Sequence, residues 1–194
     1  MKKLKIILTL LLSVIMFSGF WSAKSDKEIN AENNKAKQER RQKNSEILNK
    51  LYKYDPKAKK MIQRSYGYAT FTNFGVNLIL LSAEGGKGLA YNNKTKKYTY
   101  MNMASGGLGF GLGVKEFIII FLFQNKKVFD NFVDSGWEAN AQVDIAAKAG
   151  ENGGAINAAI TVAPGIRLYK LTENGIALQA TIQGTKYWKD DDLN

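Results

Sequence analysis

The side chains that could do chemistry in this sequence are mainly cations. It contains 28 Lys and Arg, 17 Asp and Glu, and neither His nor Cys. Without imidazoles and thiols, the usual zinc sites, thiol catalysis and the Ser-His-Asp relay are excluded. We therefore predict a protein that binds anions, is not an enzyme, and needs no metal or cofactor. Four carboxylates occur close together but repeat no metal-binding or paired-carboxylate pattern: Asp130, Asp134, Glu138 and Asp144.

The cations are concentrated near the N-terminus. Residues 24–64 hold thirteen Lys and Arg against six Asp and Glu, whereas residues 65–194 hold twelve against eleven. This asymmetry indicates an electrostatic contact, because each Lys or Arg held near an anionic membrane surface contributes about 1 kcal/mol. A solvated, lysine-rich helix is the alternative interpretation. The candidate contact residues in this segment are Arg40, Arg41, Lys43, Lys50, Lys57, Lys59, Lys60 and Arg64.

A second basic spot falls at the tip of a predicted hairpin, in which residues 89–91 pair with residues 98–100. Tyrosines beside lysines suit a membrane interface, although most lysine-rich tips serve only solubility. The candidate residues at this tip are Lys94, Lys96 and Lys97, and the flanking tyrosines are Tyr91, Tyr98 and Tyr100.

Two helices must position the first set of cations. Ile47, Leu48 and Leu51 recur at helical spacing and predict an amphipathic helix. Asp55 and Pro56 end that helix and begin a second one, with Asp55 as its N-cap. The apolar face of the first helix either docks on the sheet, which we favour, or lies among lipid headgroups.

A glycine-rich stretch, GGLGFGLGVKEFIIIFLF, invites comparison with phosphate-binding loops. Its glycines recur at every second position from Gly107 to Gly113, which fits neither a dinucleotide fingerprint nor a P-loop. We predict instead that residues 107–114 form one strand with a bare glycine face. Residues 117–123 form a buried strand after it.

The remaining pattern predicts an α+β fold, mainly an antiparallel, strongly twisted sheet or partial barrel with N-terminal helices and one short helix packed against it. The predicted short helix covers residues 126–133 and is capped by Asn125. Further strands are expected at residues 68–71, 76–81, 137–147, 158–162, 165–170 and 176–188, with a turn at residues 73–75. The acidic tail after Trp188 is expected to fray.

The first 23 residues are typical of a targeting segment. A basic start is followed by an apolar run from Ile6 to Phe17, and we weigh a cleaved signal peptide above an uncleaved anchor. Either one predicts a secreted or extracytoplasmic protein. The expected organisation is a signal or anchor at residues 1–23, a basic helical or flexible arm at 24–46, a folded domain at 47–188 and an acidic tail at 189–194.

The order of these blocks resembles the SYLF domain. The segment DPKAKKMIQRSYGYATF is similar to the opening of that domain, where a helix beginning Asp/Asn-Pro-x-Ala leads into a Gly-x-Ala-x-Phe strand; here Ser65, Tyr66 and Thr72 depart from the family pattern. The central segment SGGLGFGLGVKEFIIIFLFQNKKVFDNFVDSGWEANAQVDIAA and the closing hairpin IRLYKLTENGIALQATIQGTKYW are similar to its later blocks. The resemblance covers about residues 47–188.

What the resemblance implies is a non-enzymatic, lipid-binding module of the cell envelope or secreted space. It would contact anionic headgroups, phosphoinositide-like in the eukaryotic members, through a basic N-terminal helical region. The alternatives are an interaction protein that binds an anionic wall polymer or a protein partner, a nucleic-acid binder, a membrane β-barrel and a hydrolase. The targeting segment argues against nucleic acid, buried strand runs against a membrane barrel, and the absence of a nucleophile–base pair against a hydrolase.

Overall fold

The computed structural model describes residues 24–79, 81–107, 111–139, 159–172, 175–177 and 184–194. The chain divides into two compact units, residues 1–34 and residues 35–194. Helix α2 (Asp26–Tyr54) crosses the boundary between them. In the first unit, α2 begins with a capping box, since the Ser25 backbone N–H donates to the Glu28 carboxylate at 2.9 Å and the Glu28 backbone N–H donates to Ser25 Oγ at 3.4 Å.

The second unit is built on four long antiparallel strands, β1 (Gly67–Ile79), β2 (Leu81–Asn92), β3 (Tyr98–Gly107) and β4 (Gly111–Phe123). Consecutive strands β1, β2 and β3 pair in order, and β4 returns to pair with the free edge of β1. The spatial order β4-β1-β2-β3 is that of a Greek key.

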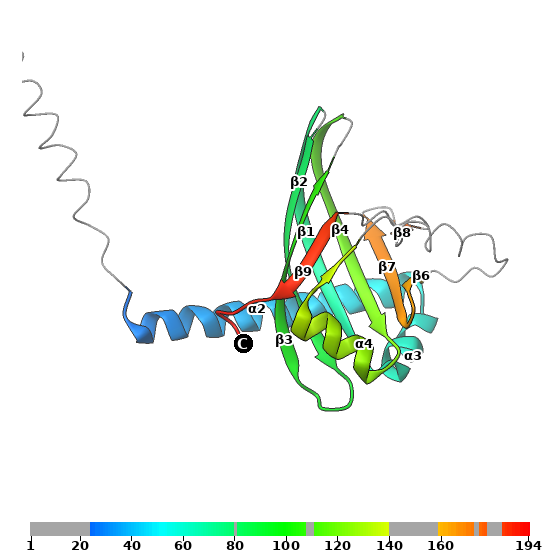
Figure 1. The fold of residues 1–194 in the computed structure, drawn as a ribbon, viewed down its shortest axis with the longest axis horizontal. Helices are drawn as coiled ribbons and strands as arrows, with labels where there is room; N and C mark the ends of the chain where they lie inside the picture. The colour runs from blue at the N-terminus through cyan, green and yellow to red at the C-terminus, as the bar shows by residue number, and fades with distance from the viewer. Residues whose placement is uncertain (1–23, 80, 108–110, 140–158, 173–174, 178–183) are drawn as a thin grey trace, which may run out of the picture. The chain divides into compact units, whose positions relative to one another are not determined.

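Shorter strands extend this sheet at both edges. Next to β4 lie β7 (Ile166–Thr172), β6 (Ile160–Ala163) and β8 (Gly175–Ala177). Next to β3 lie β9 (Thr185–Lys189) and then β5 (Trp137–Glu138). Every pairing in the described part of the chain is antiparallel, and the sheet curls into a half-barrel (Figure 1). The predicted fold class is therefore confirmed.

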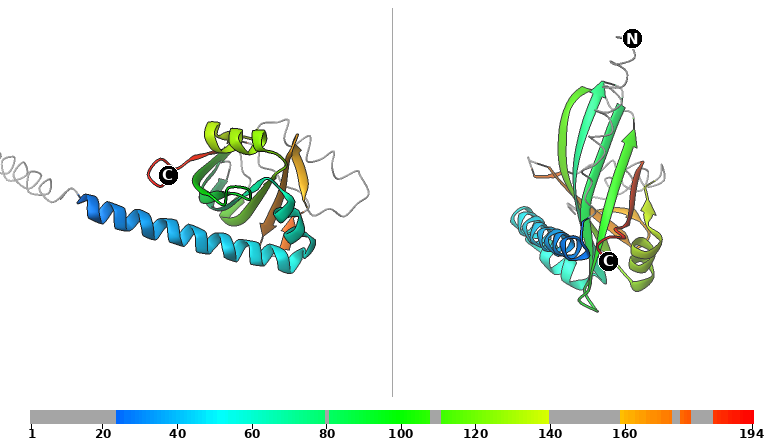
Figure 2. Two further views of the ribbon diagram at one scale, coloured as in Figure 1. Left: turned by 90° about the horizontal axis from the view of Figure 1, so that it is seen from below. Right: turned by 90° about the vertical axis from the view of Figure 1, so that its left-hand side faces the viewer.

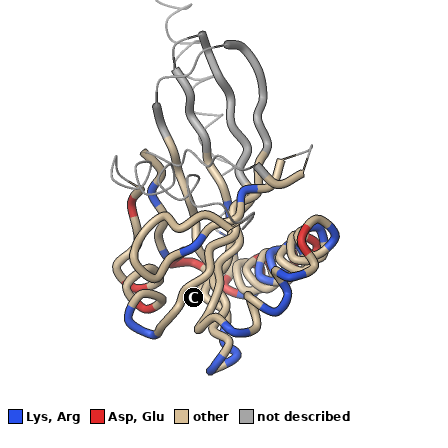
Figure 3. Tube along the Cα trace, turned by 90° about the vertical axis from the view of Figure 1, so that its right-hand side faces the viewer, with Lys and Arg blue, Asp and Glu red and all other residues tan. Residues whose placement is uncertain are grey.

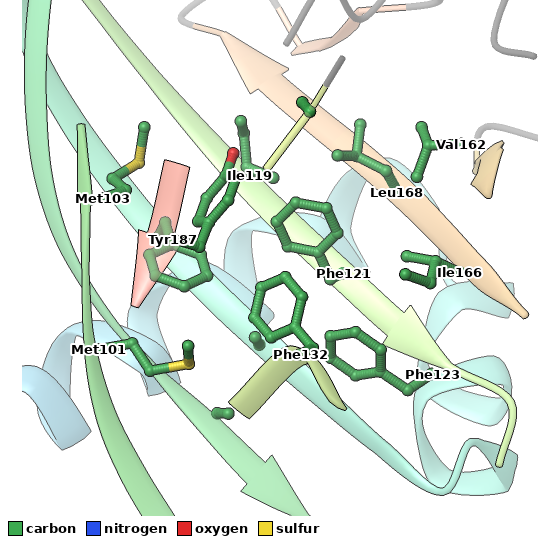
Figure 4. Close-up of a cluster of buried hydrophobic side chains, with 14 of the residues drawn as sticks. Met101, Met103, Ile119, Phe121, Phe123, Phe132, Val162, Ile166, Leu168 and Tyr187 are labelled. Carbon is green, nitrogen blue, oxygen red and sulfur yellow. The ribbon is translucent and has the colours of Figure 1, made fainter. Parts of the chain in front are cut away.

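The concave face of the half-barrel holds an aromatic core (Figure 4). Phe71, Phe121 and Tyr187 are fully buried, and the Phe121 ring lies 5.0 Å from the Tyr187 ring and 6.1 Å from the Phe71 ring. Phe132 comes from the single turn of π-helix η1 (Asn131–Ser135) that follows α4 (Lys126–Asp130), and it joins the same cluster. These rings interlock because alternate residues of each strand point to the same face of the sheet.

The opposite face of the sheet is covered by the second-unit part of α2 and by α3 (Lys57–Arg64), whereas α4 lies on the concave side (Figure 2). Ile47 and Leu51 of α2 retain only 3% and 0% exposure and pack against Ile120 and Tyr169. The apolar face of this helix therefore docks on the sheet, as we favoured, and is not available to a bilayer.

Four strand predictions are wrong. Residues 76–81 are not one strand, because β1 ends at Ile79 and β2 begins at Leu81. Residues 176–188 are not one strand either, because β8 pairs with β7 whereas β9 pairs with β3. Residues 73–75 do not turn but continue β1, because this strand lies between β2 and β4 and each of the three residues pairs on both sides. The glycine-rich stretch is not one strand: Gly107 ends β3 and Gly111 begins β4, and residues 108–110 lie outside the described residues. The alternating glycines correctly indicated strand geometry. They did not indicate that the stretch is divided between β3 and β4, which are separated in the sheet by β2 and β1.

Several local predictions are confirmed. The hairpin pairs Leu89 with Tyr100 and Tyr91 with Tyr98, in the register that the sequence indicated. Asn125 caps α4, its side chain accepting from the Val128 backbone N–H at 3.1 Å. The predicted strand at residues 137–147 is described only at its start, β5, and residues 140–158 lie outside the described part of the chain.

Candidate functional site

Arg40, the first candidate contact residue, is buried. Its guanidinium forms an ion pair with Asp190 at 2.6 Å, and both side chains are only 9% exposed. The same group donates to the backbone carbonyl of Met101 at 2.9 Å and to Asn102 Oδ1 at 3.3 Å. Because these acceptors lie inside the protein, Arg40 holds the fold together, and we leave it out of the proposed contact surface.

The acidic tail supplies the partner of Arg40, so the expectation that it frays is wrong. Leu193 is 4% exposed, and the Asn194 side chain both accepts from the Tyr100 backbone N–H at 2.9 Å and donates to the Tyr100 carbonyl at 2.8 Å. We call Arg40, Asp190, Leu193 and Asn194 the C-terminal clasp. It fastens the end of the chain and helix α2 to strand β3.

The next three candidates on α2 have separate environments. Arg41 donates from Nε to the Tyr100 hydroxyl at 2.6 Å and lies over the Tyr98 ring at 4.8 Å. Lys43 is exposed and lies 3.3 Å from the Glu46 carboxylate. Lys50 is half-buried and donates to the backbone carbonyl of Thr172 at 3.3 Å. Arg41 therefore lies against the tyrosines of β3, apart from Lys43 and Lys50, which are two turns apart on one side of the helix.

Helix α3 presents the next four cations. Ala58 and Ile62 are buried against the sheet, so the other sides of the helix face solvent. Its start is fixed as predicted, because the Asp55 carboxylate accepts from the Lys57 backbone N–H at 3.0 Å. Another oxygen of Asp55 accepts from the Tyr169 hydroxyl at 3.1 Å, which anchors this end to β7. The exposed cations are Lys57, Lys59, Lys60 and Arg64.

The β2–β3 loop presents three more exposed lysines, Lys94, Lys96 and Lys97. The buried Asn92 shapes the loop, since its side-chain oxygen accepts from the Lys94 and Thr95 backbone N–H groups at 2.8 and 3.0 Å. Lys96 has a φ of 59°, in the left-handed region.

Asn93 ties this loop to the end of α3. Its side-chain amide donates to the Ile62 carbonyl at 2.7 Å and to the Ser65 carbonyl at 3.1 Å. Asn93-Lys94-Thr95 matches the pattern for N-glycosylation, but these hydrogen bonds occupy the side-chain amide that the modification would use.

These segments meet at one end of the sheet. Gly67 pairs with both Asn92 and Phe123, so the start of β1, the end of β2 and the end of β4 lie at the same level. Helix α4 follows Phe123 directly, and the Phe129 ring lies 5.7 Å from that of Tyr66, just before β1. Lysines and arginines gather around this end (Figure 3). We define the basic end as Lys57, Lys59, Lys60, Arg64, Lys94, Lys96, Lys97, Lys126 and Lys127.

Two of these residues, Lys126 and Lys127, were missed by the sequence analysis. They stand alone between Asn125 and an apolar run, so only the pairing of β1 with β4 brings them to the other lysines. Asp55 and Asp130 are the only acidic residues in the three segments that form the basic end, all of which are described (55–66, 92–98 and 124–130). Asp130 forms an ion pair with Lys126. The Asp130 carboxylate raises the pKa of Lys126, because it accepts a hydrogen bond from the ammonium group and carries the opposite charge.

Chemical reactivity is not indicated by the described part of the chain. It holds no group of three or more acidic residues that could bind a metal ion. Asp134 is paired with Lys189 at 3.0 Å and Glu138 is exposed, while Asp144 lies outside the described residues. Burial raises the pKa of Tyr68 to about 12 and also raises that of Tyr169, which keeps both phenols neutral at ordinary pH.

The fold and this surface define an α+β half-barrel with one cationic end. No family model matches the chain, so the resemblance to SYLF domains stays a prediction. The chain is 38% identical over 178 residues to a protein of Aeromonas veronii called Beta cell expansion factor A. The match covers 89% of this chain and 66% of that protein, so the chain spans just under two thirds of the relative's length. Among the helices that the structure describes, none has the length and apolar character needed to cross a membrane.

Proposed function

We propose that this protein is a non-enzymatic, lipid-binding module that contacts anionic headgroups through its basic end. The observation that carries the proposal is the convergence of nine cations from α3, the β2–β3 loop and α4 at one end of the sheet. The side chains of Lys57, Lys59 and Lys60 and of the three loop lysines are exposed and can reach a flat surface.

Electrostatics favour a membrane surface as the partner. A Lys or Arg near an anionic bilayer contributes about 1 kcal/mol, and the contributions of several residues act together. Tyr98 at the start of β3 is 37% exposed beside the loop lysines, and an aromatic ring in that position suits the headgroup region. The resemblance to SYLF domains, which implies binding to acidic lipids, also supports the proposal, as does the targeting segment expected at residues 1–23.

Vesicle co-sedimentation tests the proposal. The protein is mixed with vesicles of phosphatidylcholine alone or with added phosphatidylglycerol, at low and high salt. We expect pelleting only with the anionic lipid and its loss at high salt, because exposed charges are screened over about 10 Å at 0.1 M salt.

A charge-matched pair of variants locates the contact. The test variant carries Lys59→Gln, Lys60→Gln, Lys96→Gln and Lys97→Gln at the basic end. The control carries Lys35→Gln, Lys37→Gln, Lys53→Gln and Lys186→Gln, which remove equal charge elsewhere. At about 1 kcal/mol each, the first set weakens binding by roughly a thousandfold, and the control retains most of its binding. Equal losses in both variants would show that net charge, not this surface, attracts the vesicle.

Two further measurements test for other partners. Retention on purified cell wall, with no vesicle binding, would favour the alternative of an anionic wall polymer. The similarity to Beta cell expansion factor A favours a second candidate function, an action on beta cells, as that protein's name states. Addition of the purified protein to cultured beta cells, followed by cell counting, tests it, with heat-denatured protein as the control.

A further inference from the structure

A groove of about 920 Å³ lies beside helix α2, on the face of the sheet that this helix covers. Such a volume falls within the range of small-molecule sites, roughly 300–1,000 Å³. The groove is separate from the basic end and shares none of its nine cations. Its lining comes from α2 and from strands β1, β2, β3, β4 and β7.

Part of the lining is apolar and part is bare backbone. Ile47, Ile118 and Leu171 contribute aliphatic surface, and Gly85 leaves strand β2 without a side chain there. A Cβ atom added to Gly85 would meet no heavy atom within 4 Å, so the space in front of this residue is open. Gly85 lies two residues before Lys87 in a regular strand, and both therefore face the groove.

The charged residues of the described lining are mainly cations. Lys43, Lys50 and Lys87 line the groove together with one carboxylate, Glu46. Glu46 is 3.3 Å from Lys43, so the described lining offers no second carboxylate to Lys50 and Lys87. Lys50 donates to the neutral carbonyl of Thr172, and Lys87 is exposed. Among the side chains that the structure describes, no carboxylate lies within ion-pair distance of Lys87.

We propose that this groove binds a single-chain anionic amphiphile of the fatty-acid type. Its carboxylate would accept hydrogen bonds from Lys50 and Lys87, and its hydrocarbon chain would lie over the bare strand at Gly85 and against Ile118. An aliphatic floor beside the ammonium groups of Lys50 and Lys87 matches the two halves of such a molecule in polarity and charge. This site goes beyond the proposed surface contact, because it takes one amphiphile molecule at a time and uses different residues.

A fluorescence titration tests the site in the complete protein. The probe is 11-(dansylamino)undecanoic acid, used below the concentration at which it aggregates, and the competitors are laurate, dodecanol and acetate. We expect saturable enhancement of dansyl fluorescence that laurate reverses most effectively. Dodecanol lacks the charge and acetate lacks the chain, so both compete poorly. An absence of saturable enhancement would overturn the proposal.

Matched variants separate this groove from the basic end. Gly85→Trp fills the open space and should weaken probe binding by roughly tenfold or more, while vesicle pelleting is unchanged. Lys87→Gln removes one charged donor and should cost roughly tenfold, whereas Lys96→Gln at the basic end should have no effect. Unchanged probe affinity in Gly85→Trp, with its circular dichroism spectrum preserved, would overturn the site. Should Gly85→Trp fail to fold, the Lys50→Gln/Lys87→Gln double variant decides, and unchanged affinity in it would equally overturn the proposal.

Discussion

Arg40 and Lys60 are both cations on helices that cover the same face of the sheet, yet their surroundings are opposite. Arg40 is buried in the C-terminal clasp and faces four acceptors, including Asp190 at 2.6 Å. Lys60 is exposed at the basic end. A positive side chain therefore stabilises the fold in the clasp, whereas at the basic end it is exposed and accessible to a ligand. The difference depends on whether buried hydrogen-bond acceptors lie near the side chain. The residue type alone does not show this.

The largest expected effect comes from breaking the clasp. Arg40→Ala leaves the Asp190 carboxylate buried without its partner, and such a change costs about 3–5 kcal/mol. Lys60→Ala, at an exposed site, should change the free energy of unfolding by only about 0.5 kcal/mol or less. Urea denaturation of both variants measures the contrast. Equal stabilities would mean that the clasp contributes no more than a surface charge.

A smaller loss of stability is expected at alkaline pH, and it comes from Tyr68, which lies beneath helix α2. The Tyr68 hydroxyl accepts from the buried Asn44 amide at 3.1 Å, and burial raises its pKa to about 12. Because the unfolded chain loses this proton near pH 10, the contribution of Tyr68 to stability should be constant up to pH 10 and decline from pH 10 to 12. The expected loss from Tyr68 is about 2–3 kcal/mol.

Comparison with Tyr68→Phe isolates this contribution. The variant should show a shallower decline in the free energy of unfolding over that interval, measured by denaturation at each pH. Tyr169, whose pKa is also raised, accounts for part of the remaining slope. An identical slope in both proteins would exclude Tyr68 as a source of the alkaline loss.

Two glycines of β2, Gly88 and Gly85, allow the packing beside the clasp to be compared with that of a more open part of the same strand. A Cβ at Gly88, whose carbonyl faces Arg40 of the clasp, would lie 2.2 Å from the Thr70 carbonyl oxygen and 2.4 Å from the Phe71 ring. Gly88→Ala should therefore destabilise the fold by about 1–3 kcal/mol through overpacking. Gly85→Ala places its methyl group in open space and should be neutral or slightly stabilising. Thermal unfolding followed by circular dichroism ranks the two variants, and a reversed order would contradict the packing described for this strand.

The smallest expected effect tests how the basic end is held together. Asn93→Ala removes the hydrogen bonds from the β2–β3 loop to the end of α3, at a cost of about 1 kcal/mol. Vesicle binding should weaken by a few-fold, because the loop lysines are less well positioned beside those of α3. The measurement is co-sedimentation at a temperature where the variant is fully folded. Unchanged binding would show that the loop lysines act without fixed positions.

The sequence alone was sufficient for features that depend on neighbouring residues. The register of the β2–β3 hairpin, the start of α3 at Asp55 and the cap at Asn125 follow from periodicity and from side chains bonding to nearby backbone groups. Helical spacing placed Ile47 and Leu51 on one face, and the structure bears out docking on the sheet, which we favoured over contact with lipid. The class of fold could be predicted for the same reason, since it follows from the order of helices and strands.

Only the tertiary structure decided which of the cations are available. Arg40 finds its partner 150 residues away in a tail that composition alone marks as a frayed end, and Lys126 joins the basic end only through the pairing of β1 with β4. The same pairing makes β1 continuous and separates Gly107 from Gly111. Contacts between distant segments depend on how the whole sheet is assembled. A buried ion pair or a pairing between two strands joins residues that are far apart in the sequence, so no short stretch of the sequence predicts it.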